Sequence, residues 1–371
     1  MSDIEHQVCT RCLMDSSAEE IIFDSQGQCS FCKIHEEKML STPVARDDRE
    51  ATLSAVVDDI KANRKGEYDC IVGLSGGVDS SYIAYKAVQL GLKPLAVHFD
   101  NGWNSELAVK NIESIVKKLD LDLVTFVIDW EEFRDIQRSF FKANVIDIEM
   151  VTDHAIFASL FDIAKKHKIR YILSGTNYAT ESIMPPSWQH FKFDLRNLRA
   201  IQSRFGTMKI KNYPTISVWR MAFNHYILGF KSISLLNYMP YKKEDAMKLL
   251  EEKLGWQYYG GKHWESTFTK FYQSYLLPVK FGVDKRKCHL SDMIMNEELS
   301  REDAYGELQA PLYNKVSLEL DTEYVCKKLG FSKDEFGEYM STKEVSHYTY
   351  PSYAKLAHRL VKIHKRIVYK K

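Results

Sequence analysis

The sequence predicts an α/β fold with a doubly wound parallel sheet, preceded by a cysteine-rich metal module and followed by a mostly helical region. Short apolar runs alternate with helix-like patterns through the first half of the chain, which is typical of parallel strands joined by right-handed crossovers. A glycine-rich turn separates the first apolar run from the first of these helices. Two close pairs of cysteines near the start predict the metal module.

The elements can be assigned in chain order. Strands are expected at residues 68–73, 94–99, 123–128 and 169–173, and the helices around them at 79–91, 104–119, 131–143 and 153–167. Beyond residue 240 the pattern is mainly helical, and the tail 355–371 has apolar residues at helical spacing. We therefore divide the chain into a metal module, a linker helix, an α/β domain and a helical C-terminal region, at residues 1–35, 36–66, 67–240 and 241–371.

The glycine-rich turn reads Gly-Leu-Ser-Gly-Gly-Val-Asp-Ser-Ser over residues 73–81. Glycines let a backbone approach a ligand closely, and the N–H groups that open a helix point at an anion. No lysine follows the glycines, so the turn is not the common phosphate loop. We expect it to cradle phosphate groups, although a glycine turn before a capped helix is the simpler alternative. The expected contacts are Ser75, Gly76, Gly77, Asp79, Ser80 and Ser81.

Two further strand ends are polar. The second predicted strand ends in His98-Phe-Asp-Asn-Gly102, and the fourth in Ser174-Gly-Thr-Asn177. Ligands of parallel sheets lie beyond the carboxyl ends of the strands, so three such ends at one edge would surround one nucleotide. A hydrogen-bonded strand-end histidine is the simpler explanation of His98.

The two cysteine pairs are Cys9-Thr-Arg-Cys12 and Cys29-Ser-Phe-Cys32. Two such pairs facing each other form a tetrahedral sulfur site that suits zinc, and an iron–sulfur cluster would also accept four thiolates. All four positions are filled by protein, so we expect a structural metal. Of the remaining cysteines, Cys288 lies in the basic run 285–289, where a redox role is a minor alternative.

The net charge and the distribution of apolar residues argue against several classes of protein. The chain has 371 residues, a formal net charge of +1 and no run of 18 apolar residues. A near-zero charge argues against a large nucleic-acid footprint, and the absence of such a run argues against a membrane span. The acidic, polar first residues do not resemble a secretion signal. A cytoplasmic protein with reduced cysteines is therefore expected.

The turn resembles the pyrophosphatase loop (PP-loop) of the HUP-like ATP-pyrophosphatases, which cut ATP to AMP and pyrophosphate. Together with the cysteine pairs and several further motifs, the chain is similar to the N-acetyl sugar amidotransferase family of O-antigen and other surface-glycan biosynthesis. The further motifs are Asp153-His-Ala-Ile156, Ser174–Glu181, Met184–Trp188, Tyr259–Glu265 and Phe281–Ser291. The resemblance covers residues 9 to about 310. It implies conversion of a sugar acetamido group into an acetamidino group with ATP, Mg²⁺ and ammonia.

The resemblance also implies site residues. Asp79 would organise Mg²⁺, or serve only as a helix N-terminal carboxylate. Adenine, ribose or other parts of the nucleotide would meet His98, Phe99, Gly175 and Thr176. Lys285 and Arg286 would bind pyrophosphate, and Lys262 would contact phosphate or substrate. Glu181 would accept a proton or bind the sugar. The simpler alternative for each of these four residues is a solvated or structural charge. Trp188 and Arg196 are weaker candidates for a sugar or nucleotide contact.

The source of ammonia and the acceptor lead to predictions about partners. The chain shows no glutaminase domain, so a separate glutaminase and an ammonia-channel subunit are expected beside an N-acetylated, nucleotide-linked sugar. The main rival is a PP-loop tRNA thiolase, which also adenylates a carbonyl oxygen but needs a sulfur-handling cysteine and a basic tRNA surface. A zinc-ribbon adaptor without ATP turnover is the non-enzymatic alternative.

Overall fold

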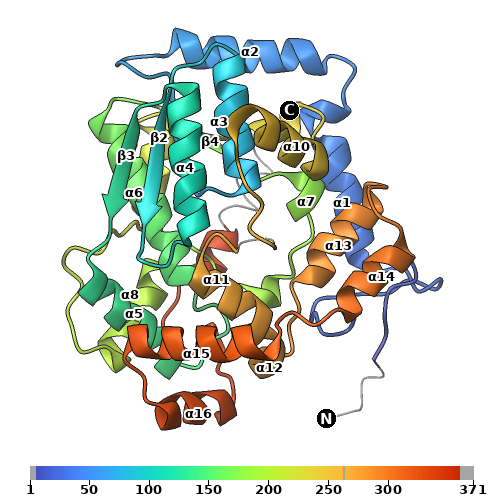
Figure 1. Cartoon of the computed structure of the whole chain (residues 1–371), viewed down its shortest axis with the longest axis vertical. Helices are drawn as coiled ribbons and strands as arrows, with labels where there is room; N and C mark the ends of the chain where they lie inside the picture. Colours follow the sequence, from blue (N-terminus) through green and yellow to red (C-terminus); the bar gives the residue numbers. More distant parts are fainter. Residues whose placement is uncertain (1–5, 262–263, 360–371) are drawn as a thin grey trace.

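The computed structural model describes residues 6–261 and 264–359 and confirms the predicted α/β class. Five parallel strands lie in the order β3-β2-β1-β4-β5. Their arrowheads point toward the side of the molecule where α11 and α12 lie (Figure 1). The strands are β1 Cys70–Gly73, β2 Pro94–Asp100, β3 Leu123–Val127, β4 Tyr171–Ser174 and β5 Lys231–Ser234.

The central strands are buried because helices cover both faces of the sheet. Ile71 and Val72 of β1 are fully buried, which explains why this strand reads as a continuous apolar run. Each predicted helix between strands is present within a few residues of its expected bounds. These helices are α3 Val78–Gln89, α4 Glu106–Leu119, α5 Trp130–Lys142 and α6 Met150–Lys166.

The fifth strand was not predicted from the sequence. β5 contains only Lys-Ser-Ile-Ser, and its first two residues are exposed at the edge of the sheet. Such a short and polar segment has no apolar alternation, so its register comes from pairing with β4 alone. Between β4 and β5 lie α7 Tyr178–Glu181, α8 Leu195–Phe205 and α9 Val218–Tyr226.

The N-terminal segment differs in detail from the predicted division. Helix α1 Ser30–Ser41 begins between the cysteines of the second pair and continues across the expected boundary at residue 35. The predicted linker helix corresponds to α2 Arg49–Ala62, which buries Val57 and Ile60. The metal module is therefore continuous with a helix that enters the body of the protein.

The C-terminal region is helical, as predicted. Its helices are α10 Lys243–Leu254, α11 Thr267–Phe271, α12 Leu277–Phe281, α13 Arg286–Met295, α14 Arg301–Gln309, α15 Lys315–Leu329 and α16 Lys333–Ser341. A π-helical turn, η4 Tyr272–Leu276, joins α11 to α12. The predicted tail helix lies largely outside the described residues. In the part of the chain that is described, no helix combines the length and apolar character needed to cross a membrane.

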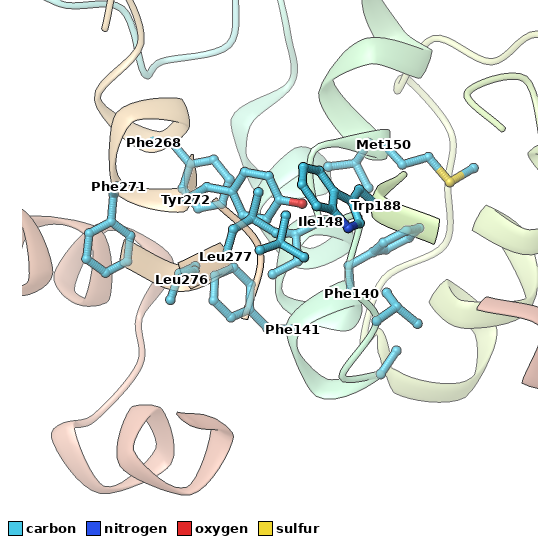
Figure 2. Packing of buried hydrophobic residues seen from close by; sticks show 14 of the residues in the cluster. Phe140, Phe141, Ile148, Met150, Trp188, Phe268, Phe271, Tyr272, Leu276 and Leu277 are labelled. Carbon is cyan, nitrogen blue, oxygen red and sulfur yellow. The ribbon is translucent and has the colours of Figure 1, made fainter. Parts of the chain in front are cut away.

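The largest hydrophobic cluster joins the two halves of the chain. Figure 2 shows Phe268 and Tyr272 of the C-terminal region close to Ile148 and Trp188 of the α/β half. All four are nearly inaccessible to solvent. Burial of each large side chain contributes about 1.5–3 kcal/mol, so this cluster fixes the C-terminal helices against the carboxyl edge of the sheet.

Candidate active site

The glycine-rich turn lies between β1 and α3, where the sequence predicts an anion cradle. Gly76 has φ +82°, and a Cβ there would lie 2.5 Å from the carbonyl oxygen of Ala108. Its carbonyl accepts a hydrogen bond from the indole N–H of Trp256 at 2.8 Å. Only glycine satisfies both the backbone angle and the close approach.

Replacing Gly76 with alanine is expected to destabilise the protein and weaken nucleotide binding. The positive φ alone costs roughly 1–3 kcal/mol, and the collision with Ala108 adds to it because that neighbour is backbone. Gly282 is a matched control, since its φ is +65° but a Cβ added there would meet nothing within 4 Å. Thermal unfolding should show a larger loss for Gly76→Ala than for Gly282→Ala; equal losses would contradict this account of the turn.

Serine hydroxyls hold the turn in shape. Ser81 is fully buried and donates to the carbonyl of Gly77 at 2.6 Å, so it supports the loop from behind. Ser75 accepts from the N–H of Gly77 at 3.2 Å, and its own hydroxyl lies 3.0 Å from that of Ser80. Ser75 and Ser80 thus present their polar atoms at the open side of the turn.

A pocket lies against this turn, at the carboxyl ends of β1 and β4. Gly175 packs closely on the start of α3, where a Cβ would lie 3.3 Å from the Ser80 amide nitrogen. The structure therefore brings most of the predicted nucleotide contacts to one place. The lining comprises Ser75, Gly77, Val78, Asp79, Ser80, Ser174, Gly175, Thr176, Thr180, Glu181, Lys243, Tyr259 and Glu265.

Three carboxylates line the pocket: Asp79, Glu181 and Glu265. Tyr241 donates its hydroxyl to Asp79, and burial, followed by the charge of Asp79, raises the pKa of Tyr241 far above its usual value. The tyrosine therefore stays protonated and orients the carboxylate. Carboxylate and hydroxyl oxygens are the ligands that Mg²⁺ prefers, so these residues fit a nucleotide-bound magnesium ion.

Four predicted nucleotide contacts lie outside this lining: Gly76 and Ser81, which belong to the turn itself, and His98 and Phe99. His98 is buried; its Nδ1–H donates to the carbonyl of Leu74 at 3.1 Å, and its Nε2 accepts from Asn104 at 3.1 Å. Phe99 stacks on Phe126 with ring centroids 5.5 Å apart. These contacts match the simpler explanation of His98, a histidine that fixes the strand end.

The predicted pyrophosphate partners also lie elsewhere. The guanidinium of Arg286 pairs with Asp284 and donates to the carbonyls of Glu307, Leu308 and Ala310. These contacts use the whole guanidinium group to anchor α13 to the end of α14. The ammonium of Lys285 lies 5.7 Å from the ring centroid of Tyr272, and Lys285 is not one of the lining residues. The predicted contact of Lys262 falls outside the described residues.

The structure adds lining residues that sequence reasoning missed. Lys243, the first residue of α10, supplies a cation to the lining, and Tyr259 and Glu265 come from the segment before α11. The run 259–265 is one of the sequence motifs, but the motif alone assigns no role to these two residues. The sequence around Lys243 does not indicate a site residue, because Lys243 reaches the pocket only through the path that the chain takes after β5.

The weaker candidates have structural roles. Trp188 is 1% exposed, belongs to the large hydrophobic cluster and donates its indole N–H to the carbonyl of Ser17 at 3.3 Å. Arg196 lies over the ring of Tyr353, 4.9 Å from its centroid. Cys288 is buried in the same hydrophobic cluster. These positions favour packing over ligand contact.

The four predicted metal-binding cysteines come together at the N-terminus. Their sulfur atoms lie within 4.8 Å of one another, with 3.6 Å between Cys12 and Cys29 and 3.7 Å between Cys9 and Cys32. A tetrahedral zinc site with Zn–S bonds of about 2.3 Å requires sulfur atoms about 3.8 Å apart. Backbone N–H groups also point at the Cys9 sulfur, from Arg11 at 3.3 Å and Cys29 at 3.2 Å. The arrangement fits structural zinc.

The metal module is connected to the pocket through buried polar contacts. His35 of α1 lies 2.7 Å from the hydroxyl of Ser182, the residue after Glu181, and 2.9 Å from Asp292 of α13. Ser182 donates to the same carboxylate at 2.6 Å. All three residues are at most 2% exposed. Through His35, helix α1 thus connects the metal module to the end of α7 and to α13.

Comparisons with known proteins match two segments of the chain. Residues 50–185 match the family model of NAD synthase, and residues 265–364 match the model described as LPS biosynthesis protein WbpG-like, C-terminal domain. A tRNA(Ile)-lysidine synthase from Chlamydia pneumoniae is 30% identical over 99 residues, or 26% of this chain and 29% of that protein. The chain thus matches less than a third of that relative's length.

Two solved structures are also similar in part. NMN synthetase from Francisella tularensis aligns at 13% identity over 58% of this chain and 98% of its own, with a TM-score of 0.31. A predicted subunit of tRNA methyltransferase from Methanocaldococcus jannaschii DSM aligns at 15% identity over 49% of this chain and 74% of its own, with a TM-score of 0.29.

The two family matches both contribute to the pocket lining, while Lys243 and Tyr259 lie between the matched segments. The NAD synthase segment contains the glycine-rich turn, Gly175 and Glu181, and the WbpG-like segment begins at Glu265. One segment of the chain is therefore similar to NAD synthase and another to the WbpG-like C-terminal domain of lipopolysaccharide biosynthesis, which confirms the predicted resemblance to PP-loop proteins of glycan biosynthesis.

Proposed function

We propose that the protein is an ATP-dependent amidotransferase that converts the acetamido group of a sugar into an acetamidino group during O-antigen or related surface-glycan biosynthesis. The observation that carries the proposal is the pocket itself, in which a PP-loop and Glu265 of a lipopolysaccharide-biosynthesis domain face each other. The acceptor is an N-acetylated, nucleotide-linked sugar, and the protein acts in the cytoplasm with a partner glutaminase and an ammonia-channel subunit.

The proposed chemistry begins with a poor electrophile. An amide carbon resists ammonia because its oxygen is a poor leaving group, and transfer of AMP to that oxygen makes it a good one. The site must hold the triphosphate and stabilise charge that develops on pyrophosphate. The turn from Ser75 to Ser80 provides hydroxyls and helix N–H groups for this task. Magnesium bound at Asp79 would neutralise the phosphate oxygens.

Lys243 is the pyrophosphate partner that this geometry supports, in place of Lys285 and Arg286. It is the cation among the described residues of the lining, and it stands at the first position of α10. Glu181 lies in the same lining and keeps its proposed role toward the sugar or the attacking nitrogen. Both assignments can be tested one residue at a time.

Replacing Lys243 with alanine is expected to raise the KM for ATP about tenfold and to lower kcat by about ten- to a hundredfold, since one cation near the leaving group is lost. Lys248→Ala is the control, because Lys248 is exposed on the same helix. Arg286→Ala should instead lower the melting temperature, because it removes the anchor between α13 and α14. Steady-state AMP release and thermal unfolding measure these effects; an Arg286 variant that lost only ATP affinity would restore the original assignment.

The function itself is tested by product analysis. The protein is incubated with ATP, Mg²⁺, ammonium chloride and a panel of nucleotide-linked 2-acetamido sugars. Release of AMP and pyrophosphate that depends on one sugar, with a product mass lower by one unit because NH replaces O, is the expected result. A parallel incubation with tRNA and a sulfur donor tests the thiolase alternative, and 2-thiouridine formation there would favour it.

A further inference from the structure

A second polar cluster lies at the boundary between the two family segments and outside the pocket lining. We call it the junction cluster. Its carboxylates come from the NAD synthase segment and one of its lysines from the WbpG-like segment. Ligand sites occur preferentially where two such parts meet. Its charged members are Asp147, Glu149, Asp153, Lys192 and Lys285.

Two short connections link the junction cluster to the nucleotide pocket. Glu265 lines the pocket, and four residues later Thr269 donates its hydroxyl to Glu149 at 2.5 Å. On the other side, His289 of α13 lies 3.5 Å from the carbonyl of Thr180 in the lining. Lys285 stands one helical turn before His289, so two segments of the chain connect the cluster to residues of the pocket lining.

One half of the junction cluster is internally satisfied. The ammonium of Lys192 lies 2.6 Å from Asp147 and 3.0 Å from Asp153. Although burial opposes it, the charges of Lys192 and Lys285 lower the pKa of Asp147 to about 2. Asp147 also accepts a hydrogen bond from the N–H of His190 at 2.7 Å. The ion pair of Asp147 and Lys192 is therefore a fixed structural contact.

Glu149 differs from these groups. Thr269 is its side-chain hydrogen-bond donor among the described residues, so its other carboxylate oxygen has no such donor there. Burial, followed by the charge of Asp153, raises the pKa of Glu149. The neighbours Ile148 and Met150 pack into the hydrophobic cluster with Tyr272 and Trp188 (Figure 2). Glu149 is therefore a partly buried carboxylate between two core residues of the sequence, with a side-chain donor on one of its oxygens.

A second observation points to a ligand at the same place. Residues 149, 152 and 153 lie on one face of α6, three and four positions apart. The hydroxyl oxygen of Thr152 is buried without a hydrogen-bond partner among residues 6–261 and 264–359, and the residue is 9% exposed. The junction cluster also contains three carboxylates (Asp147, Glu149 and Asp153) but two lysines (Lys192 and Lys285). One negative charge therefore has no counterion among these five residues. A small cation with N–H donors would meet both needs.

We propose that Glu149, with Asp153 and Thr152, forms the site that receives the nitrogen nucleophile and holds the cationic amidinium product. This inference rests on the proposed function. An amidinium is planar with N–H groups on two nitrogens, and a carboxylate matches that shape as it matches a guanidinium. Glu149 is thereby assigned as the proton acceptor of the second half of the reaction, which leaves Glu181 the role toward the sugar.

The proposed step balances as follows. The lone pair of neutral ammonia attacks the carbon of the O-adenylated, N-protonated imidate, and a C–N bond forms. The C–O bond then breaks, and AMP leaves with the electron pair and the former amide oxygen. One proton from the added nitrogen goes to the Glu149 carboxylate. The products are the amidinium, AMP and a protonated Glu149, which releases its proton to solvent.

Binding of the acetamidinium ion tests the site without any turnover. Titration calorimetry with acetamidinium chloride is done on the full chain loaded with ATP and Mg²⁺. Glu149→Gln should weaken binding at least tenfold, because the amide keeps the shape but not the charge. Glu20→Gln is the matched control, since Glu20 also accepts one hydroxyl hydrogen bond, from Ser187 at 2.8 Å. Equal binding by wild type and Glu149→Gln, or no measurable binding by wild type, would overturn the proposal.

Partial reactions separate this proposal from the proposed function. Acceptor-dependent exchange of pyrophosphate into ATP reports adenylation, and amidine formation reports attack by ammonia. Glu149→Gln should retain exchange within about threefold, lower amidine formation at least a hundredfold and raise the KM for ammonium. Equal loss of exchange and amidine formation would overturn the role of Glu149. Absence of exchange in wild type with every sugar would overturn the proposed function, while acetamidinium binding would still decide the site.

Discussion

Replacing Asp79 with asparagine is expected to lower AMP formation on the order of a thousandfold while leaving the fold intact. Asp79 lies in the first turn of α3 and in the pocket lining, and Tyr241 fixes its carboxylate by a hydrogen bond. Asparagine can still accept that hydrogen bond but carries no charge for magnesium. Circular dichroism should be unchanged, and ATP turnover with the acceptor should be lost.

The alternative for Asp79 is a carboxylate that only stabilises the start of a helix. Such an effect is worth about 0.3–1 kcal/mol and concerns stability alone. Asp245 offers the comparison, because it is an exposed carboxylate in the first turn of α10. If Asp79→Asn and Asp245→Asn behaved alike, with slightly lower melting temperatures and normal turnover, the proposed magnesium role would be wrong.

Removing the metal from the four-cysteine site is expected to unfold the N-terminal module and to abolish turnover with it. Structural zinc supplies on the order of 10 kcal/mol, which is comparable to the whole stability of a domain. Without it, α1 loses the anchor at Cys29 and Cys32, and His35 can no longer support Ser182 beside Glu181. Cys29→Ser should contain less than one zinc per chain, melt at a lower temperature and show little AMP release.

Two variants separate the metal from its connection to the pocket. Cys326→Ala is the control thiol, since burial raises the pKa of Cys326 to about 11 and it lies far along the chain in α15. It should retain zinc and activity. His35→Ala should retain zinc but lose about tenfold or more in kcat/KM, because the wall carrying Glu181 is loosened. Full activity in a zinc-free Cys29→Ser protein would contradict this coupling.

The parts of the fold that follow from local chemistry could be predicted from the sequence. The turn around Gly76 could be predicted because its backbone angle and its helix start are local, whereas its close approach to Ala108 could not. The cysteine pairs are similarly local, since each pair presents two sulfur atoms from one tight turn. In both cases the structure brings together the residues that the spacing predicts.

The parts that depend on long-range packing could not be predicted in this way. Arg286 lies in a basic run, yet its partners are carbonyls of residues 307–310, which become its neighbours only when α14 folds back. Lys243 shows the reverse case, because nothing in its local sequence distinguishes it from the other lysines of α10. The same holds for Glu149, whose surroundings come from three separate segments of the chain.

The fate of the amide oxygen tests the central claim most directly. The acceptor sugar is prepared with ¹⁸O in the carbonyl of its acetamido group and is turned over with ATP and ammonium. If the amide oxygen is adenylated and then displaced, the account predicts one ¹⁸O atom in the phosphate of the released AMP and none in pyrophosphate. Label in orthophosphate together with ADP, or label retained in the sugar product, would contradict it.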